Sequence, residues 1–437
     1  MTRLISIWNN ILTLALPFLL IGVMLGYVHL PILFAFFILL LLSMKKMELC
    51  ISMLLIFPPL LGTIFQIFDY SIPGSIIPVF FVLLLLPKRL SKILYNKRGT
   101  ILFTLVIISI FVVYYFLTAK TEYSEKKIVE LLITSFIYFI AFSLMSSSSN
   151  IDTSCIGKIF YVYGLVLTSI GLDILSYSQF NNLFDFSSFR DASNAMKELE
   201  LISISYHSVG IAGMTGLAFL MSSPRNRKVD FFIVPAFIWL ILISGARQAL
   251  VGALLVFFMK YVMNHRKLNM VDVAKWAILL VIIIIALLIA DIETVNSVFD
   301  SKASAGERLN RNFDYPFKIL EQHFIDGIGF GNYDNTVARE VYPHNIILEI
   351  LCEMGFVGFL ILSFVVFIFI IRNKISLRYQ LLCRSYAIII YTPYLVRSLI
   401  SDSIGHNISV FILLFTLYSK EKDKFLTSSL NKERKTK

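Results

Sequence analysis

Long apolar stretches separated by short polar turns recur along almost the whole chain. Many are close to the roughly 20 residues that an α-helix needs to cross a bilayer. Because backbone groups in lipid must be satisfied within their own segment, the pattern predicts an all-α polytopic integral membrane protein. Crowding near the N-terminus leaves a range of 12–14 transmembrane helices. The predicted spans are 7–27, 29–44, 48–68, 73–87, 100–118, 128–146, 158–177, 204–222, 230–244, 248–263, 272–290, 345–371, 381–400 and 406–418.

Composition agrees with this class of protein. The 437 residues are 57% hydrophobic and only 15% charged, which is more apolar than a typical soluble domain. There is no internal sequence repeat and no low-complexity linker. We therefore expect a single multi-pass membrane domain over residues 1–437.

The positive charges, which give a net charge of +11, follow the predicted topology. Cytoplasmic loops of membrane proteins carry an excess of lysine and arginine. In a fourteen-span count the main basic clusters all fall on one side, with both termini cytoplasmic. Topology thus accounts for the basic excess, and no nucleic-acid partner is expected. The clusters are Lys45-Lys46, Lys88 to Arg98, Arg225 to Lys228, Arg266-Lys267, Arg372 to Arg378 and the tail from Lys420.

Two longer segments then lie on the outer side, at about 178–203 and at 291–343. The second is the longest polar stretch of the chain. Within 308–324, apolar residues recur at roughly helical spacing, which predicts a short amphipathic helix on the outer membrane surface. Its apolar positions are Leu309, Phe313, Phe317 and Leu320.

Four arginines on the outer side are candidate binders of an anionic substrate. Arg247 occupies a tight turn after Ser244-Gly245-Ala246, Arg308 and Arg311 lie in the long loop, and Arg190 lies in the other outer segment. Arginine is depleted in short outer loops, and its planar guanidinium binds phosphate in a bidentate manner. The alternative is a side chain that only reaches toward the membrane interface.

His344 is the candidate general base. It follows Pro343, precedes Asn345 and stands at the start of a long apolar span. An imidazole that takes a proton from a hydroxyl accelerates a reaction by roughly 10² to 10⁴ fold. The alternative is a structural residue or helix cap. Glu349 lies about one turn further on, where it would orient the imidazole, pair with an arginine or simply pack between helices.

Glu353, about two turns beyond His344, has the same alternatives. His207 lies at the outer end of its span and would line a cavity. We place Asn345, Glu349, Arg190 and His207 in supporting roles.

No metal or cofactor is expected. The cysteines are scattered, no Cys-x-x-Cys pair occurs, and the outer loops have no Asp-Asp or Asp-x-Asp pair of the kind that supplies oxygen ligands to a metal ion. The glycines from Gly327 to Gly331 lack the spacing of a phosphate-binding loop. They predict a turn that brings the long loop back to the membrane.

Taken in order, these residues resemble the bacterial O-antigen polymerase and O-antigen ligase family. That family has a basic turn between two spans, an outer loop with a further arginine, a glycine-rich exit, and His-Asn followed after nine residues by Gly-x-x-Gly. Here the last motif runs from His344-Asn345 to Gly355 and Gly358, with Ile346–Met354 as the spacer. The resemblance covers residues 240–375 and includes a periplasmic loop, 291–343.

The resemblance implies an inverting, metal-independent glycosyl transfer at the periplasmic face of the bacterial inner membrane. The donor would be an oligosaccharide on undecaprenyl diphosphate. His344 would deprotonate the acceptor hydroxyl, and Arg247 and Arg308 would hold the diphosphate. Arg311 and Arg190 do not align with the further arginines of the family.

Three functions remain open at this point. A polymerase joins repeat units, and we favour it because the large outer loop would hold a growing glycan. A ligase transfers the finished chain to lipid A-core. A lipid-linked oligosaccharide flippase or other transporter is the alternative without enzymatic activity. Besides membrane lipid, the partners would be a chain-length regulator and a flippase of the same pathway.

Overall fold

The computed structural model describes residues 2–42, 47–56, 98–147, 151–174, 206–223, 228–264, 314–333, 343, 345–373, 387–400 and 408–417. Nearly all of these residues are helical, and none of the described segments is a strand. Four helices are long and apolar enough to cross a membrane, and seven shorter apolar helices accompany them in the described part of the chain. The predicted class, an all-α polytopic membrane protein, is confirmed.

The chain divides into two compact units. The first comprises Met1–Pro73, Ile151–Asp300 and Ile388–Pro393, and the second comprises Gly74–Asn150, Ser301–Ala387 and Tyr394–Lys437. Helix α20 (Ala387–Ile400) has residues in both units. Whether the two units fold as one domain, as the sequence predicts, stays a prediction.

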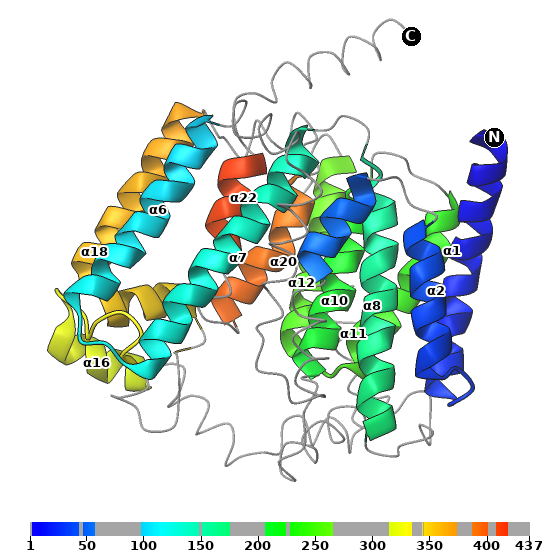
Figure 1. The fold of residues 1–437 in the computed structure, drawn as a ribbon, viewed down its shortest axis with the longest axis horizontal. Helices are drawn as coiled ribbons and strands as arrows, with labels where there is room; N and C mark the ends of the chain where they lie inside the picture. The colour runs from blue at the N-terminus through cyan, green and yellow to red at the C-terminus, as the bar shows by residue number, and fades with distance from the viewer. Residues whose placement is uncertain are drawn as a thin grey trace, which may run out of the picture. The chain divides into compact units, whose positions relative to one another are not determined.

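The first unit is built around helix α8, whose apolar window is entirely buried. Helix α10 lies directly against α8 (Figure 1). A side chain at Gly157 of α8 would stand 2.6 Å from the carbonyl oxygen of Gly216 of α10, so glycine permits this close approach. The labelled helices of this unit are α1 (Thr2–Met24), α2 (Leu30–Leu42), α8 (Thr153–Ile174), α10 (Tyr206–Met221), the 3₁₀ helix η1 (Lys228–Ile233), α11 (Val234–Ile243) and α12 (Arg247–Asn264), and a further helix covers Met47–Ile56.

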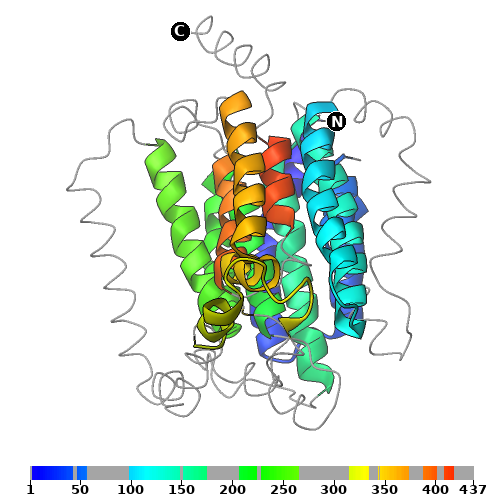
Figure 2. The ribbon, with the colours of Figure 1, turned by 90° about the vertical axis from the view of Figure 1, so that its left-hand side faces the viewer.

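In the second unit, helix α6 contacts α7, α18 and α22 (Figures 1 and 2). Aromatic rings join them, since Phe103 of α6, Phe369 of α18 and Phe415 of α22 lie with ring centroids 4.5 to 5.7 Å apart. The helices of this unit are α6 (Arg98–Leu117), α7 (Glu122–Ser147), α16 (Tyr315–His323), α18 (Ile346–Arg372) and α22 (Ser409–Leu417).

The observed helices follow most of the predicted spans. The predicted spans 73–87 and 272–290 lie outside the described residues, as does the second half of 48–68, whose first part is a helix at Met47–Ile56. The largest difference is α7, which begins at Glu122 rather than at residue 128. The first six residues of α7 are mostly charged or polar, so the apolar pattern does not include this first turn and a half.

Helix ends that the alternating topology assigns to the same side lie together within each unit. In the first, Lys260 near the end of α12 donates to the carbonyl oxygen of Met221 at the end of α10 (2.7 Å). In the second, Lys127 near the start of α7 pairs with Glu353 in the early part of α18 (2.6 Å). Both contacts agree with spans that cross in alternate directions.

Candidate functional site

Several predicted site residues lie outside the described part of the chain. They are His344, Arg308, Arg311 and Arg190. The structure does describe the backbone of Arg247, and it describes Asn345, Glu349 and His207 fully. The roles predicted for all eight residues remain predictions.

The turn that carries Arg247 is tightly constructed in the first unit. Gly245 has a positive φ of 62°, and the Ser244 hydroxyl donates to the carbonyl oxygen of Ile241 (2.6 Å) while accepting from the N–H of Ala246 (3.2 Å). Arg247 is then the first residue of α12. The four N–H groups that open a helix have no partner within it, so the start of a helix favours negative charge.

His207 lies beside this turn. Its Nδ1 atom stands 3.3 Å from Nε2 of Gln248, the residue that follows Arg247. Behind the pair, Gly210 packs against Ser244 and α12, where a Cβ would come within 2.7 Å of the Ser244 hydroxyl. His207 and the Arg247 turn therefore lie together in the first unit, and the cavity-lining role predicted for His207 stays a prediction.

Asn345 caps α18 in the second unit. Its side-chain oxygen accepts hydrogen bonds from the N–H groups of Ile347 (2.9 Å) and Leu348 (3.2 Å). Its side-chain nitrogen donates to the carbonyl oxygen of Leu399 near the end of α20 (2.9 Å). One side chain thus completes the exposed start of the helix and ties it to a second helix. Asn345 acts structurally on the backbone next to His344.

Helix α18 is broken at Gly355, which has a φ of 65° and a ψ of −176°. Only glycine adopts this conformation readily. The residues before the break, Ile346–Met354, form a half-helix that runs across the direction of the rest of α18 (Figure 1). These nine residues are the spacer of the His-Asn to Gly-x-x-Gly motif, so the spacing corresponds to one short helical segment.

The glycine-rich turn enters this break and replaces the missing hydrogen bonds. In an unbroken helix the N–H groups of Phe356 and Val357 would donate to the carbonyls four residues earlier. Instead they donate to the carbonyl oxygens of Phe324 (2.7 Å) and Ile325 (3.3 Å). The released carbonyls of the half-helix accept from the turn, through Ile328 N to Cys352 O (2.8 Å) and Gly329 N to Glu353 O (2.9 Å).

The other end of the turn is fixed to the start of α7. Thr121 and Ser124 cap this helix reciprocally, each side-chain oxygen accepting from the other residue's N–H (2.9 and 3.0 Å). The Thr121 hydroxyl also donates to the carbonyl oxygen of Gly331 (3.3 Å). A Cβ at Gly331 would stand 2.6 Å from the Ser124 Cα atom. The predicted turn is therefore present, and its glycines permit direct backbone contact with α7.

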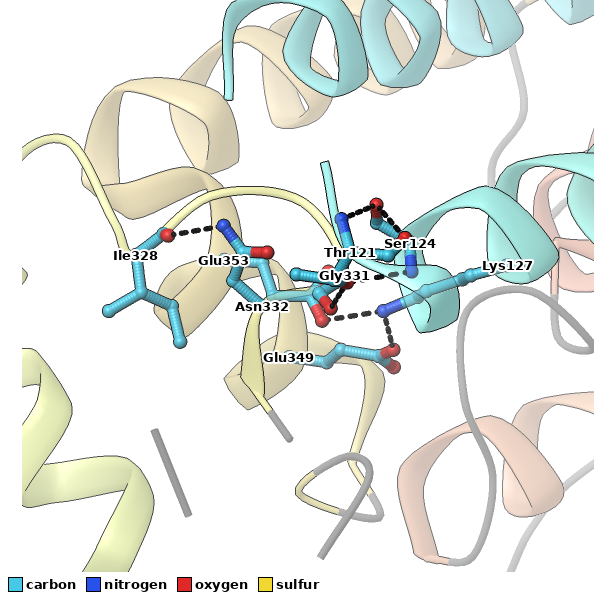
Figure 3. A network of polar contacts seen from close by, with 8 residues as sticks. All are labelled: Thr121, Ser124, Lys127, Ile328, Gly331, Asn332, Glu349 and Glu353. Carbon is cyan, nitrogen blue, oxygen red and sulfur yellow. Dashed lines mark hydrogen bonds and ion pairs between the residues drawn. The ribbon is translucent and has the colours of Figure 1, made fainter. Parts of the chain in front are cut away.

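A buried ionic cluster joins α7 to the half-helix (Figure 3). The ammonium of Lys127 lies 2.6 Å from a carboxylate oxygen of Glu349 and 2.6 Å from one of Glu353. All three side chains are at most 2% exposed. The same ammonium lies over the rings of Phe330 (5.0 Å) and Tyr123 (5.7 Å). Burial of such charges is stabilising only when they are closely paired, because each has lost its water.

Lys127 was not singled out from the sequence. Glu349 and Glu353 were predicted to serve the imidazole, an arginine or helix packing, and the structure shows that both pair with this lysine. Two glutamates one turn apart in an apolar span require a cationic partner, and that requirement was the available signal. Lys127 was hidden because it stood next to Lys126, just before the predicted start of its span.

The second part of the amphipathic helix predicted at 308–324 corresponds to α16, Tyr315–His323. The first part, with Leu309 and Phe313, lies outside the described residues. Figure 2 looks onto the face where α16 lies across the end of α18. Ile319 packs with Tyr333 and Cys352, whereas Phe317 is 51% exposed. The exposed phenylalanine fits a helix that turns one apolar side toward lipid, and its place on the membrane surface stays a prediction.

Two helix starts that other residues hold in place therefore carry or adjoin the residues for which chemical roles are predicted. In the first unit, the start of α12 presents Arg247, a residue type suited to an anionic group. In the second unit, the half-helix follows directly after His344 and is held by a cap, an ion cluster and the glycine-rich turn. Rigid support of this kind is what a general base needs in order to meet its substrate at a fixed geometry.

Comparison with known protein families gives one match. Residues 231–363 match the model of a family described as O-antigen ligase. The matched residues extend from η1 into the second half of α18 and include the Arg247 turn and the break at Gly355. The resemblance to the O-antigen polymerase and ligase family is thereby confirmed. No curated protein matches the chain.

Proposed function

We propose that this chain, which contains a region of the O-antigen polymerase and ligase family, is a multi-pass membrane glycosyltransferase that joins glycan repeat units carried on undecaprenyl diphosphate. The observation that carries the proposal is the family match over residues 231–363. That region encloses the Arg247 turn, His344 and the complete half-helix. The match favours an enzyme over the transporter considered from the sequence.

The proposed reaction is a direct displacement at the anomeric carbon. His344 takes the proton of the acceptor hydroxyl, whose oxygen forms the new bond to that carbon. The bond from the carbon to the diphosphate oxygen breaks, and the lipid diphosphate leaves with the electron pair. Arg247 and Arg308, with Arg311 as a further candidate, hold the negative charge of the leaving group. Attack from the opposite face inverts the anomeric centre.

The ligase is the second candidate, and the description of the matched family favours it. Both reactions use the same donor chemistry and differ only in the acceptor. A polymerase uses the terminal sugar of another lipid-linked glycan, whereas a ligase uses a sugar of lipid A-core. The long segment 291–343 would hold a growing glycan, which supports the polymerase.

The glycan profile of a strain that lacks this gene distinguishes the polymerase from the ligase. We expect lipid A-core with a single repeat unit, because the ligase of the strain would still transfer unpolymerised units. Full-length chains that remain on undecaprenyl diphosphate would show instead that the chain is the ligase. A wild-type profile of both lipid fractions would contradict both candidates.

Replacement of Arg247 by lysine is expected to lower activity roughly tenfold or more while leaving the protein folded. Lysine keeps the charge but has no planar pair of donors for two phosphate oxygens. The measurement is the rate of glycan extension per folded protein. Lys260→Arg, at the far end of the same helix, is the matched control because it makes the reverse exchange away from the turn. Wild-type turnover in Arg247→Lys would mean that the Arg247 side chain extends to the membrane interface without binding the diphosphate.

A further inference from the structure

We infer that Lys127 is a positioning residue for the glycosyl transfer, acting through the half-helix of α18 on the segment that carries His344. The inference rests on the proposed function. It adds to the reaction a residue from a helix that lies outside the matched region 231–363.

The half-helix is separated from the rest of α18 at Gly355. A continuous helix transmits orientation through its ladder of backbone hydrogen bonds. At Gly355 this ladder is interrupted, and the N–H groups of Phe356 and Val357 donate to the loop rather than to the half-helix. The direction of Ile346–Met354 is therefore set by its contacts with other segments.

Other segments of the chain hold the half-helix at both of its ends. Asn345 holds the beginning of the half-helix through Leu399, and the glycine-rich turn holds its end through the carbonyls of Cys352 and Glu353. These contacts lie at the ends of the segment, as does the packing of Cys352 against Ile319 of α16. A contact that spans two successive turns fixes the rotation of the segment about its own axis more firmly than contacts at its ends alone.

Lys127 provides that contact. Glu349 and Glu353 are four residues apart and lie on one face of the half-helix, and the single ammonium of Lys127 lies 2.6 Å from each. Because all three side chains are buried, rotation of the segment would leave charges without water or a partner. The cluster therefore fixes the face that the half-helix turns toward α7, and with it the direction of the backbone that leads back to His344.

The test compares purified full-length variants in lipid nanodiscs. The substrate is the undecaprenyl-diphosphate-linked repeat unit isolated from the strain that lacks the gene. The central variant is the triple substitution Lys127→Met, Glu349→Gln and Glu353→Gln, which removes all three charges and keeps similar side-chain volumes. We expect it to fold, since neutral replacement of a complete buried ion cluster is often tolerated. We expect kcat to fall by roughly 10- to 100-fold, with KM within about threefold.

A second variant, Lys127→Arg, keeps the charge and tests the inference even if the triple variant does not fold. Its planar group meets the two carboxylates in a different geometry. We expect a folded protein whose kcat is lowered roughly tenfold, again without a matching change in KM. Wild-type kcat in either folded variant would overturn the inference and leave the cluster a purely structural feature.

The matched control is the buried pair of the first unit, Lys158 and Asp230, whose charged atoms lie 3.1 Å apart. Lys158→Met combined with Asp230→Asn removes a comparable ion pair from the other unit. We expect its kcat per folded protein to stay at the wild-type value. An equal loss of kcat in this control would also overturn a specific role for Lys127.

The inference and the proposed function can fail separately. If the strain that lacks the gene keeps a wild-type glycan profile, the proposed function is wrong. If His344→Ala is inactive while the Lys127 variants turn over at the wild-type rate, only the positioning role is wrong.

Discussion

Replacement of His344 by alanine is expected to leave the protein folded in the membrane and to lower glycan extension by roughly 10² to 10⁴ fold. Alanine cannot take the proton from the acceptor hydroxyl, so the attacking oxygen stays a poor nucleophile. The substitution leaves the Asn345 cap, the ion cluster and the turn in place, because each is formed by other residues. The measurement is the length distribution of the surface glycan, together with the extension rate of purified protein.

His323→Ala is the matched control for this experiment. His323 is the last residue of α16 and belongs to the same long loop, and its carbonyl oxygen accepts a hydrogen bond from the N–H of Gly327 (2.9 Å). We expect near-normal chains from this control. Near-normal chains from His344→Ala as well would remove the assignment of His344 as the base, and the family match would then have to be explained with another proton acceptor.

Replacement of Gly355 by alanine is expected to abolish most of the folded, active protein. The positive φ and extended ψ of this residue would strain alanine by about 1 to 3 kcal/mol. The new Cβ would in addition collide with the carbonyl group of Ile325 and lie 2.6 Å from the Gly327 nitrogen. A continuous α18 would relieve this collision, but its backbone would then bond to the carbonyl groups of Cys352 and Glu353 and displace the glycine-rich turn.

Gly99→Ala serves as the control, because a Cβ at this position near the start of α6 has nothing within 4 Å. Alanine is favoured over glycine within a helix, so we expect this variant to be at least as stable as the wild type. The readouts are the unfolding temperature in detergent and the extension rate. If Gly355→Ala matched the wild type in both, the break in α18 would be dispensable.

The helical architecture could be predicted from the sequence because it depends on apolar length alone. Helices α6, α8 and α10 begin and end within a few residues of the predicted spans. The sequence predicts the start of this span at residue 128, whereas α7 begins at Glu122. A pattern of apolar residues does not detect the first turns of a helix when those turns are polar. The cap formed by Thr121 and Ser124 marks that start, with serine where glutamate or glutamine is usual.

The pattern of apolar residues does not predict the break in α18. Residues 345–371 form one predominantly apolar run, and glycines in such runs often serve helix packing. Gly358 does pack in this way, against Tyr114 of α6. Gly355 differs in its positive φ. Its neighbours Phe356 and Val357 bond to carbonyl groups about thirty residues earlier, and local composition does not indicate such long-range contacts. The pairing of Lys127 with two glutamates was missed for the same reason.

The buried ion cluster also sets an order of events during synthesis. Lys127 leaves the ribosome 226 residues before Glu353, which at about 5 to 20 residues per second is a delay of about 10 to 45 s. Until its partners exist, the ammonium has to stay in water or among lipid head groups, since its burial alone is costly. Helix α7 therefore reaches its final depth in the bilayer only after α18 has been made, and maturation of this unit waits for a late segment of the chain.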